Sequence, residues 1–282
     1  MTTTAYIVGA ELILATAVSV WVIYFQAPLA HEEYVSSYAL RPPPRLIGRL
    51  FHFSSLVLFL VVAGADLRQT NGSCLLYYTF WNFVLQTAYW IWALIDPKRT
   101  SRARSMFLDL LLPTNMVMVV VVWAILYPLV GDDLNNWISC TQHGGNLVLL
   151  LIEFVCSDVR SVPLSTGALV GLWATTYATF AWVVHSFTNV WLYPFLDVDQ
   201  PWAPLWYVTS PYISLCPSLS RGTASCRYLG LLALHIVFFG VVALLAAIKV
   251  YIAEHIPVDY DGTSKLLLPR VTPKGSQHRP TT

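Results

Sequence analysis

Seven long apolar stretches alternate with short polar segments along the chain. Each is about 20 residues long, which is the length an α-helix needs to cross the hydrocarbon core of a bilayer. The pattern predicts an all-α polytopic transmembrane bundle with spans at Tyr6–Phe25, Ile47–Ala65, Cys74–Ile95, Met106–Val130, Asn136–Cys156, Leu164–Phe187 and Tyr228–Tyr251. The first span is expected to be a retained helix, because no positive charge precedes it as in a signal peptide.

Two regions depart from this pattern. Residues 189–227 combine aromatic side chains with five prolines, which interrupt helices. They are predicted to form a loop that lies on, or dips into, the outer membrane interface. Residues 253–282 are polar and rich in proline, and we expect a cytosolic tail there, following a transmembrane bundle at 1–252.

Composition supports a membrane location. Only 11% of the 282 residues are charged and 56% are hydrophobic, whereas soluble domains carry about 25% charged residues. The 11 tryptophans suit the two interfacial belts of a bilayer. A net charge of +1 offers no basic field for nucleic acid. A soluble enzyme and a nucleic-acid binder are excluded, and an integral multi-pass protein of an endomembrane or the plasma membrane is predicted.

Positive charge is distributed unevenly over the predicted connections. Cytoplasmic loops carry an excess of Lys and Arg. With the N-terminus outside and the C-terminus inside, only three of the 16 such residues face outward. These three are Arg68, Arg221 and Arg227. The inner side then holds Arg41, Arg45, Arg49, Lys98, Arg99, Arg102, Arg104, Arg160, Lys249, Lys265, Arg270, Lys274 and Arg279.

The five cysteines form no CxxC pair and no zinc-like cluster with histidine, so neither a metal site nor a cofactor is predicted. Four of them fall on the predicted outer side. Cys216 and Cys226 are the best local pair for a disulfide in an oxidising compartment. Free thiols in an apolar setting are the alternative.

Polar side chains inside membrane helices are costly and mark candidate functional sites. In the third span, Thr79, Asn82 and Gln86 share one helix face; in the fifth, His143, Asn146 and Glu153 fall roughly on one face. The sixth span carries His185 near its outer end, and the fourth carries Asp109 near its inner end.

Depth favours a meeting of two of these residues. Both helices enter from the outer side, and at 1.5 Å per residue Thr79 lies roughly 8 Å deep and His143 roughly 10 Å deep. A hydroxyl and an imidazole are therefore expected at matching height. The plainer alternative is structural: a threonine that bonds its own helix and a histidine that joins two helices. For Asp109 and Glu153 we expect pairing with cations or interhelical donors at the inner side.

Three segments resemble the androgen-induced and androgen-dependent family of membrane threonine hydrolases. The segment Tyr77–Gln86 is similar to that family's YLTF…LVLQ motif. The segment Asn135–Glu153 looks like its second motif, and Trp182–Leu196 is similar to its WVHHVTGMWVYPFL motif. Order and spacing agree over about residues 75–196. The segment His235–Gly240 resembles the related rolling-stone proteins.

The resemblance implies an integral-membrane hydrolase of fatty acid esters of hydroxy fatty acids. The family pairs a nucleophilic threonine with a histidine, and these fall on Thr79 and His143. Asn82, Gln86, Asn146 and His185 would support the site or the substrate, with lipid as substrate and neighbour. The alternative is a non-enzymatic rolling-stone-like protein that acts in fusion or adhesion, or as a subunit with membrane-protein partners. A transporter is disfavoured because no internal repeat is visible.

Overall fold

The computed structural model describes residues 3–26, 45–96, 102–157, 159–197 and 223–255. Within these ranges the chain forms helices and no strand, which confirms the predicted all-α polytopic bundle. The α-helices are α1 (Thr3–Gln26), α2 (Arg45–Gln69), α3 (Tyr78–Ile95), α4 (Arg102–Val120), α5 (Tyr127–Val130), α6 (Trp137–Cys140), α7 (Asn146–Cys156), α8 (Leu164–Thr188) and α9 (Thr223–His255).

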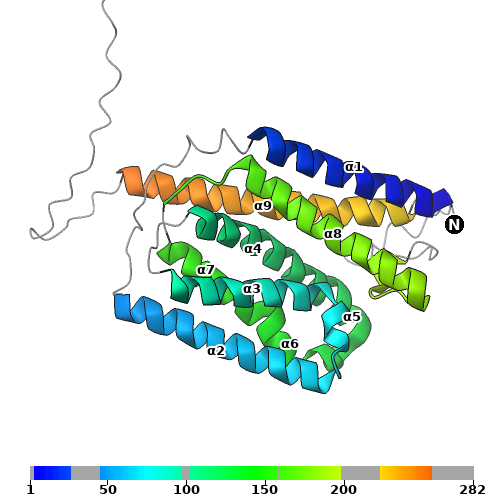
Figure 1. Ribbon diagram of the computed structural model, residues 1–282, viewed down its shortest axis with the longest axis horizontal. Helices are drawn as coiled ribbons and strands as arrows, with labels where there is room; N and C mark the ends of the chain where they lie inside the picture. The colour runs from blue at the N-terminus through cyan, green and yellow to red at the C-terminus, as the bar shows by residue number, and fades with distance from the viewer. Residues whose placement is uncertain (1–2, 27–44, 97–101, 158, 198–222, 256–282) are drawn as a thin grey trace, which may run out of the picture.

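Successive long helices run in alternating directions through the bundle (Figure 1). Helix α1 begins at the same end of the bundle at which α2 ends. This end is the outer one in the predicted orientation. Six helical stretches of the described chain are long and apolar enough to cross a membrane. The segment predicted at 74–95 folds as α3 but is not among the six. It carries polar residues such as Asn82 and Gln86, both buried inside the bundle, so its crossing remains a prediction.

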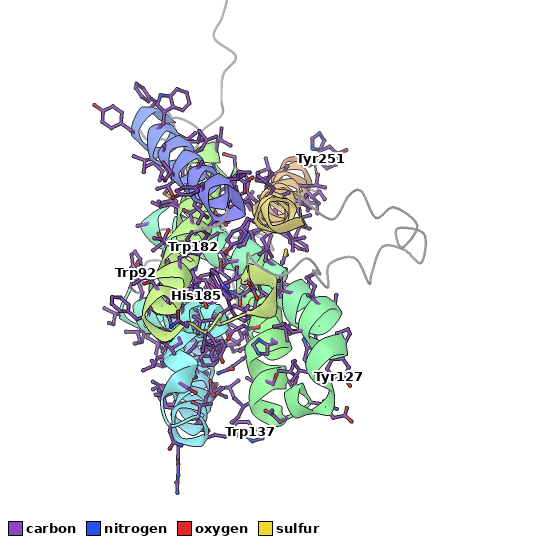
Figure 2. All side chains as sticks on the ribbon, turned by 90° about the vertical axis from the view of Figure 1, so that its right-hand side faces the viewer. Trp92, Tyr127, Trp137, Trp182, His185 and Tyr251 are labelled. Carbon is purple, nitrogen blue, oxygen red and sulfur yellow. The ribbon has the colours of Figure 1, made fainter. Side chains whose placement is uncertain are left out.

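The central helix is α4. In the most apolar part of its span 67% of residues are buried, against 17% for α1 and for α9. Exposed Leu, Ile, Val and aromatic side chains cover the outward faces of α1, α2 and α9, as lipid contact requires. Figure 2 looks along the helices from the end where α3 begins, with Trp182 and His185 on α8.

Two segments predicted as continuous α-helix each contain a π-helical stretch. One is Val121–Leu126, between α4 and α5, and the other is Thr141–Gly145, between α6 and α7. Trp123 in the first donates its indole N–H to the carbonyl of His143 in the second, at 2.8 Å. A π-turn changes the direction in which the following residues project, and such turns are frequent at functional sites.

Small residues bring α8 close to its neighbours. A Cβ on Gly167 would lie 2.8 Å from the ring of Phe239 in α9, and one on Gly171 would lie 2.9 Å from the hydroxyl of Ser19 in α1. Small residues at such crossings let membrane helices pack closely. The helix α1 is therefore an integral part of this side of the bundle.

The connection after α8 folds partly into the bundle. Asn189 ends α8 in the left-handed conformation, which frequently terminates helices. Tyr193, Phe195 and Leu196 then turn inward and are buried against α8 and α9. The predicted interfacial loop therefore begins with a segment, Tyr193–Leu196, that packs into the bundle. This segment is the plug. Residues 198–222, and with them the predicted Cys216–Cys226 bridge, lie outside the described residues, and so does most of the predicted tail.

The described cysteines give a test of orientation. Cys74 and Cys140 lie at the same end of the bundle, and both are free thiols, Cys74 buried and Cys140 exposed. Burial raises the pKa of the Cys74 thiol, so its thiolate fraction is small at neutral pH. A membrane-impermeant maleimide applied outside is expected to label Cys140 at least about tenfold faster than Cys74, because such reagents need an exposed thiolate. In a background with Cys216 and Cys226 replaced by Ser, Cys140→Ser removes the fast labelling; labelling only after permeabilisation would reverse the orientation.

Candidate functional site

Thr79 occupies an unusual place in its helix. Because α3 begins at Tyr78, Thr79 lies in the first turn, where the helix offers its hydroxyl no carbonyl four residues earlier. Thr87, about two turns further along the same helix, instead donates its hydroxyl proton to the carbonyl of Phe83 at 2.8 Å. The structural alternative for Thr79, a threonine bonded to its own helix, therefore does not describe this residue.

The hydroxyl of Thr79 interacts with Tyr193. This tyrosine belongs to the plug after α8 and packs against the start of α3. The phenolic oxygen of Tyr193 accepts the backbone N–H of Tyr78 at 3.1 Å. Burial raises the pKa of Tyr193 to about 12, while hydrogen bonds from the side chain and backbone of Thr79 oppose part of this rise. The first turn of α3 thus directs the Thr79 hydroxyl and the backbone N–H groups of Tyr78 and Thr79 toward the phenolic oxygen of Tyr193.

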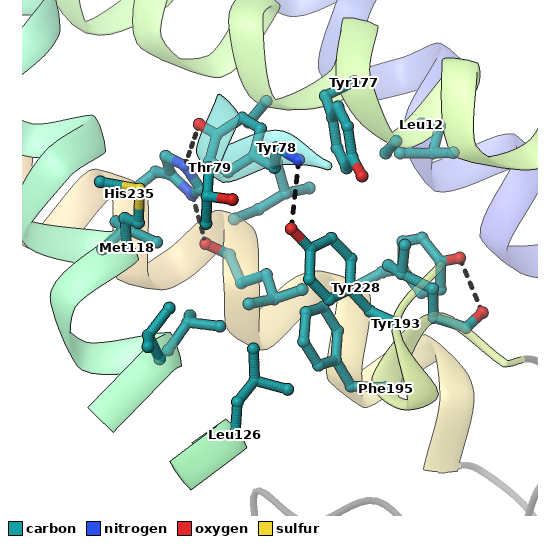
Figure 3. A pocket seen from close by; sticks show the side chains of 18 residues that line it. Leu12, Tyr78, Thr79, Met118, Leu126, Tyr177, Tyr193, Phe195, Tyr228 and His235 are labelled. Carbon is teal, nitrogen blue, oxygen red and sulfur yellow. Dashed lines mark hydrogen bonds between the residues drawn. The ribbon is translucent and has the colours of Figure 1, made fainter. Parts of the chain in front are cut away.

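An apolar pocket opens beside Thr79 (Figure 3). Its cavity volume is about 80 Å³, and its unfilled space reaches about 710 Å³ only when the part open to the outside is included. Aliphatic and aromatic side chains from α1, α3, α4, α8, α9, the first π-segment and the plug make the wall. Among them are Leu12, Met118, Leu126, Tyr177, Phe195 and Tyr228. A hydroxyl at the edge of an apolar cavity suits a lipid with a polar linkage.

His235 brings an imidazole to the same wall. Its Nδ1 lies 2.7 Å from the carbonyl of Leu231, and its Nε2 lies 3.2 Å from the hydroxyl of Tyr78. Both contacts are drawn in Figure 3. The ring is 6% exposed. Histidine, tyrosine and threonine from two helices thus meet at one cavity.

His143 is placed elsewhere. It lies in the π-segment Thr141–Gly145, which packs on α3, and its ring is buried. Its Nδ1 has no hydrogen-bond partner in the described chain. The ring is not part of the pocket wall, and no hydrogen bond joins it to Thr79 within the described ranges. The π-segment that carries His143 packs on the helix that carries Thr79, but the two side chains do not share the cavity.

The three predicted amides connect helices. Gln86 donates to the carbonyl of Asn146 at 3.0 Å, and Asn146 donates to Asn115 at 2.6 Å. Asn82 accepts the indole N–H of Trp173 at 3.0 Å. These side chains tie α3 to α7, α7 to α4, and α3 to α8, and none lines the pocket. Their geometry supports a role in holding the helices that carry the site.

His185 lies near the C-terminal end of α8, away from the pocket wall. Its ring stacks on Trp191 with centroids 3.8 Å apart and planes within 10°. Its Nδ1 is buried and lacks a partner in the described chain. This position fits a residue that secures the plug against α8.

The acidic residues at the other end pair as expected. Asp109 receives two bonds from Arg160, at 2.6 and 3.0 Å. Glu153 accepts from His52 and from Tyr89, each at 2.9 Å. Among the described residues, no group of three or more His, Cys, Asp or Glu side chains is placed to hold a metal ion.

Three pocket residues were not predicted as site residues: Tyr78, Tyr193 and His235. Tyr78 and Tyr193 lie within the first and third segments that resemble the family, as do the predicted site residues Thr79 and His185. His235 is a lone histidine in an otherwise apolar stretch, which is the signal that would have selected it.

Comparison with known proteins agrees with this architecture. The model of the family described as FAR-17a/AIG1-like protein matches residues 46–208, more than half of the chain. No curated protein and no solved structure matches the chain. The matched region runs from α2 to the plug and includes Thr79, His143 and Tyr193. This integral multi-pass membrane protein belongs to the FAR-17a/AIG1-like family.

Proposed function

We propose that this chain hydrolyses lipid esters within the membrane, with Thr79 as the nucleophile, and that its substrates are fatty acid esters of hydroxy fatty acids or similar acyl esters. The observation that carries the proposal is the position of Thr79. Its hydroxyl has no acceptor in its own helix and stands at the wall of an apolar cavity that suits an acyl chain. The resemblance of the surrounding segment to threonine hydrolases supports the same residue.

Threonine is a weak nucleophile and needs a base. We assign this role to His143, whose buried Nδ1 lacks a partner and is available to take a proton. The Thr79 oxygen bonds to the ester carbonyl carbon while its proton passes to His143. The intermediate then expels the alkoxide, which takes that proton, and an acyl-Thr79 ester remains. Catalytic hydrogen bonds often form or tighten only in the complex with substrate, and the assignment requires His143 to reach Thr79 in that complex.

The negative charge of the intermediate needs donors fixed before the reaction. The first turn of α3 provides N–H groups, and the backbone N–H of Tyr78 already donates to the Tyr193 oxygen. An ester oxygen that replaces the phenol there would receive the same donor at the positive end of the α3 dipole. Tyr193 therefore marks the place where the developing charge is stabilised.

A fluorophosphonate probe tests the proposal directly, since it bonds covalently to an activated hydroxyl. Purified protein in lipid nanodiscs is expected to become labelled, with the adduct mapped to Thr79 by mass spectrometry. Thr79→Ala should lose the label. Thr87→Ala, which removes a threonine of the same helix outside the pocket, should keep it. Equal labelling of wild type and Thr79→Ala would contradict the proposal, and so would the absence of both labelling and ester hydrolysis. The latter result would favour the non-enzymatic alternative.

A further inference from the structure

We infer that Tyr78 and His235 form a second proton-transfer pair of the site, which activates the water that releases the acyl group from Thr79. The inference rests on the proposed function and assigns a task to two residues beyond the predicted pair. His235 also lies beyond the region that the family model matches, on α9.

The contacts of His235 fix which nitrogen carries the proton. A carbonyl oxygen only accepts hydrogen bonds, so the Nδ1 at 2.7 Å from the Leu231 carbonyl must be the N–H. In the neutral ring, Nε2 then presents a lone pair. Tyr78, at 3.2 Å, therefore donates its O–H to Nε2. The Asn82 side chain also hydrogen-bonds the Tyr78 phenol, and one lone pair of the Tyr78 oxygen remains as an acceptor beside the pocket.

Among the described residues that line the pocket, His235 is the only imidazole, and none is a carboxylate, an amine or a guanidinium. The other titratable groups there are the phenols of Tyr177, Tyr193 and Tyr228. Two of these donate their protons to backbone carbonyls: Tyr177 to Leu76 at 2.9 Å, and Tyr228 to Leu196 at 3.0 Å. Tyr78 is thus the phenol that is connected to a base.

The chemistry balances without another reactant. A water molecule donates a hydrogen bond to the Tyr78 oxygen and its own oxygen attacks the acyl carbon of acyl-Thr79. The water proton moves to Tyr78 as the phenolic proton moves to Nε2 of His235. When the bond between the acyl carbon and the Thr79 oxygen breaks, the proton returns through Tyr78 to that oxygen. The products are the free acid, Thr79 with its hydroxyl, and neutral His235.

This assignment divides the reaction between two histidines. His143 acts when the ester bond is exchanged for acyl-Thr79, and His235 acts through Tyr78 when water removes the acyl group. Loss of each residue should therefore arrest the enzyme in a different state. Without His143 the free enzyme persists, whereas without His235 or Tyr78 the acyl-enzyme accumulates.

The test uses the full-length protein in nanodiscs with a p-nitrophenyl ester of a long-chain fatty acid. For His235→Gln and Tyr78→Phe we expect a burst of about one nitrophenol per protein, followed by turnover roughly 100-fold slower than wild type, the size of a lost general base. Mass spectrometry should find the acyl group on Thr79. Tyr78→Phe removes a single oxygen, so it keeps the test valid if His235→Gln does not fold.

His255→Gln is the matched control. His255 lies on the same helix, with the same contact from Nδ1 to the carbonyl four residues earlier, but it is exposed and outside the pocket. It should turn over at the wild-type rate. Wild-type turnover in both pocket variants, or slow turnover without acyl-Thr79, would overturn the role of the pair. A wild type that never forms acyl-Thr79 and does not hydrolyse the ester would instead overturn the proposed function.

Discussion

Alanine at Thr79 or at His143 is expected to stop ester hydrolysis while the bundle stays folded. Thr79→Ala removes the attacking oxygen, and His143→Ala removes the base that makes this oxygen nucleophilic. A positioned base contributes about 10²- to 10⁴-fold, so each single variant should lose at least about 100-fold in kcat. Because the two groups act in one step, the double variant should be no slower than the slower single variant.

The measurement is a double-mutant cycle on the hydrolysis rate. Thr79→Ser keeps a hydroxyl and is expected to retain part of the activity, while Thr87→Ala should match wild type. Losses of the two single variants that multiply in the double variant would show that Thr79 and His143 act independently. Hydrolysis by Thr79→Ala at the wild-type rate would refute the threonine mechanism.

The transmembrane architecture could be predicted because it depends on a coarse property. A helix must present about 20 apolar residues to hydrocarbon, and that requirement is visible in the sequence alone. The exception, α3, shows the limit of the argument. Its polar residues Asn82 and Gln86 are buried and find partners on neighbouring helices, whereas the apolar Val84 and Ile91 are exposed on another face. Mean hydropathy averages the two faces, so it does not distinguish a helix with a buried polar face from a weak span.

The pairing of buried charges could also be predicted, since a charge in a low-dielectric interior needs a partner. The expectation for Asp109 and Glu153 is confirmed by Arg160 and by His52. The partners themselves could not be named, because they come from distant parts of the chain and their choice depends on how the helices pack.

The cavity wall could be predicted only in part, for a geometric reason. Rise per residue gives depth along the membrane, but it does not give the direction in which a side chain points. The π-segment at Thr141–Gly145 adds a shift of register that no α-helical pattern anticipates. Thr79 lies at the cavity, whereas His143 lies in a segment that packs on α3 but is not part of the wall. Tyr193 and His235, rather than His143, line the cavity. Both come from segments later in the chain that return to α3.

The largest stability effect is expected at the buried pair of Asp109 and Arg160. Asp109 is 1% exposed, and Arg160, in the connection between α7 and α8, is 3% exposed. Arg160 also donates to Ser157 at 3.2 Å and to the carbonyl of Ser105 at 3.2 Å, so the guanidinium holds this connection against α4. Asp109→Ala removes the carboxylate that accepts two bonds from this buried guanidinium, and breaking a buried ion pair from one side typically costs about 3–5 kcal/mol. Thermal unfolding in detergent, followed by tryptophan fluorescence, should show a large fall in the midpoint.

Replacing both Asp109 and Arg160 gives a sharper test of the role of charge. Asp109→Leu with Arg160→Met removes both charges and keeps apolar volume, so it should recover most of the stability that Asp109→Ala loses, because no unpaired ion remains buried. Asp132→Asn serves as the control. Asp132 is an exposed carboxylate in the turn after α5 that accepts a bond from Tyr127 at 3.2 Å, and its loss should change stability by less than about 0.5 kcal/mol. A double variant as unstable as Asp109→Ala would show that the hydrogen-bonded shape of the pair, rather than the unpaired charge, stabilises this end of the bundle.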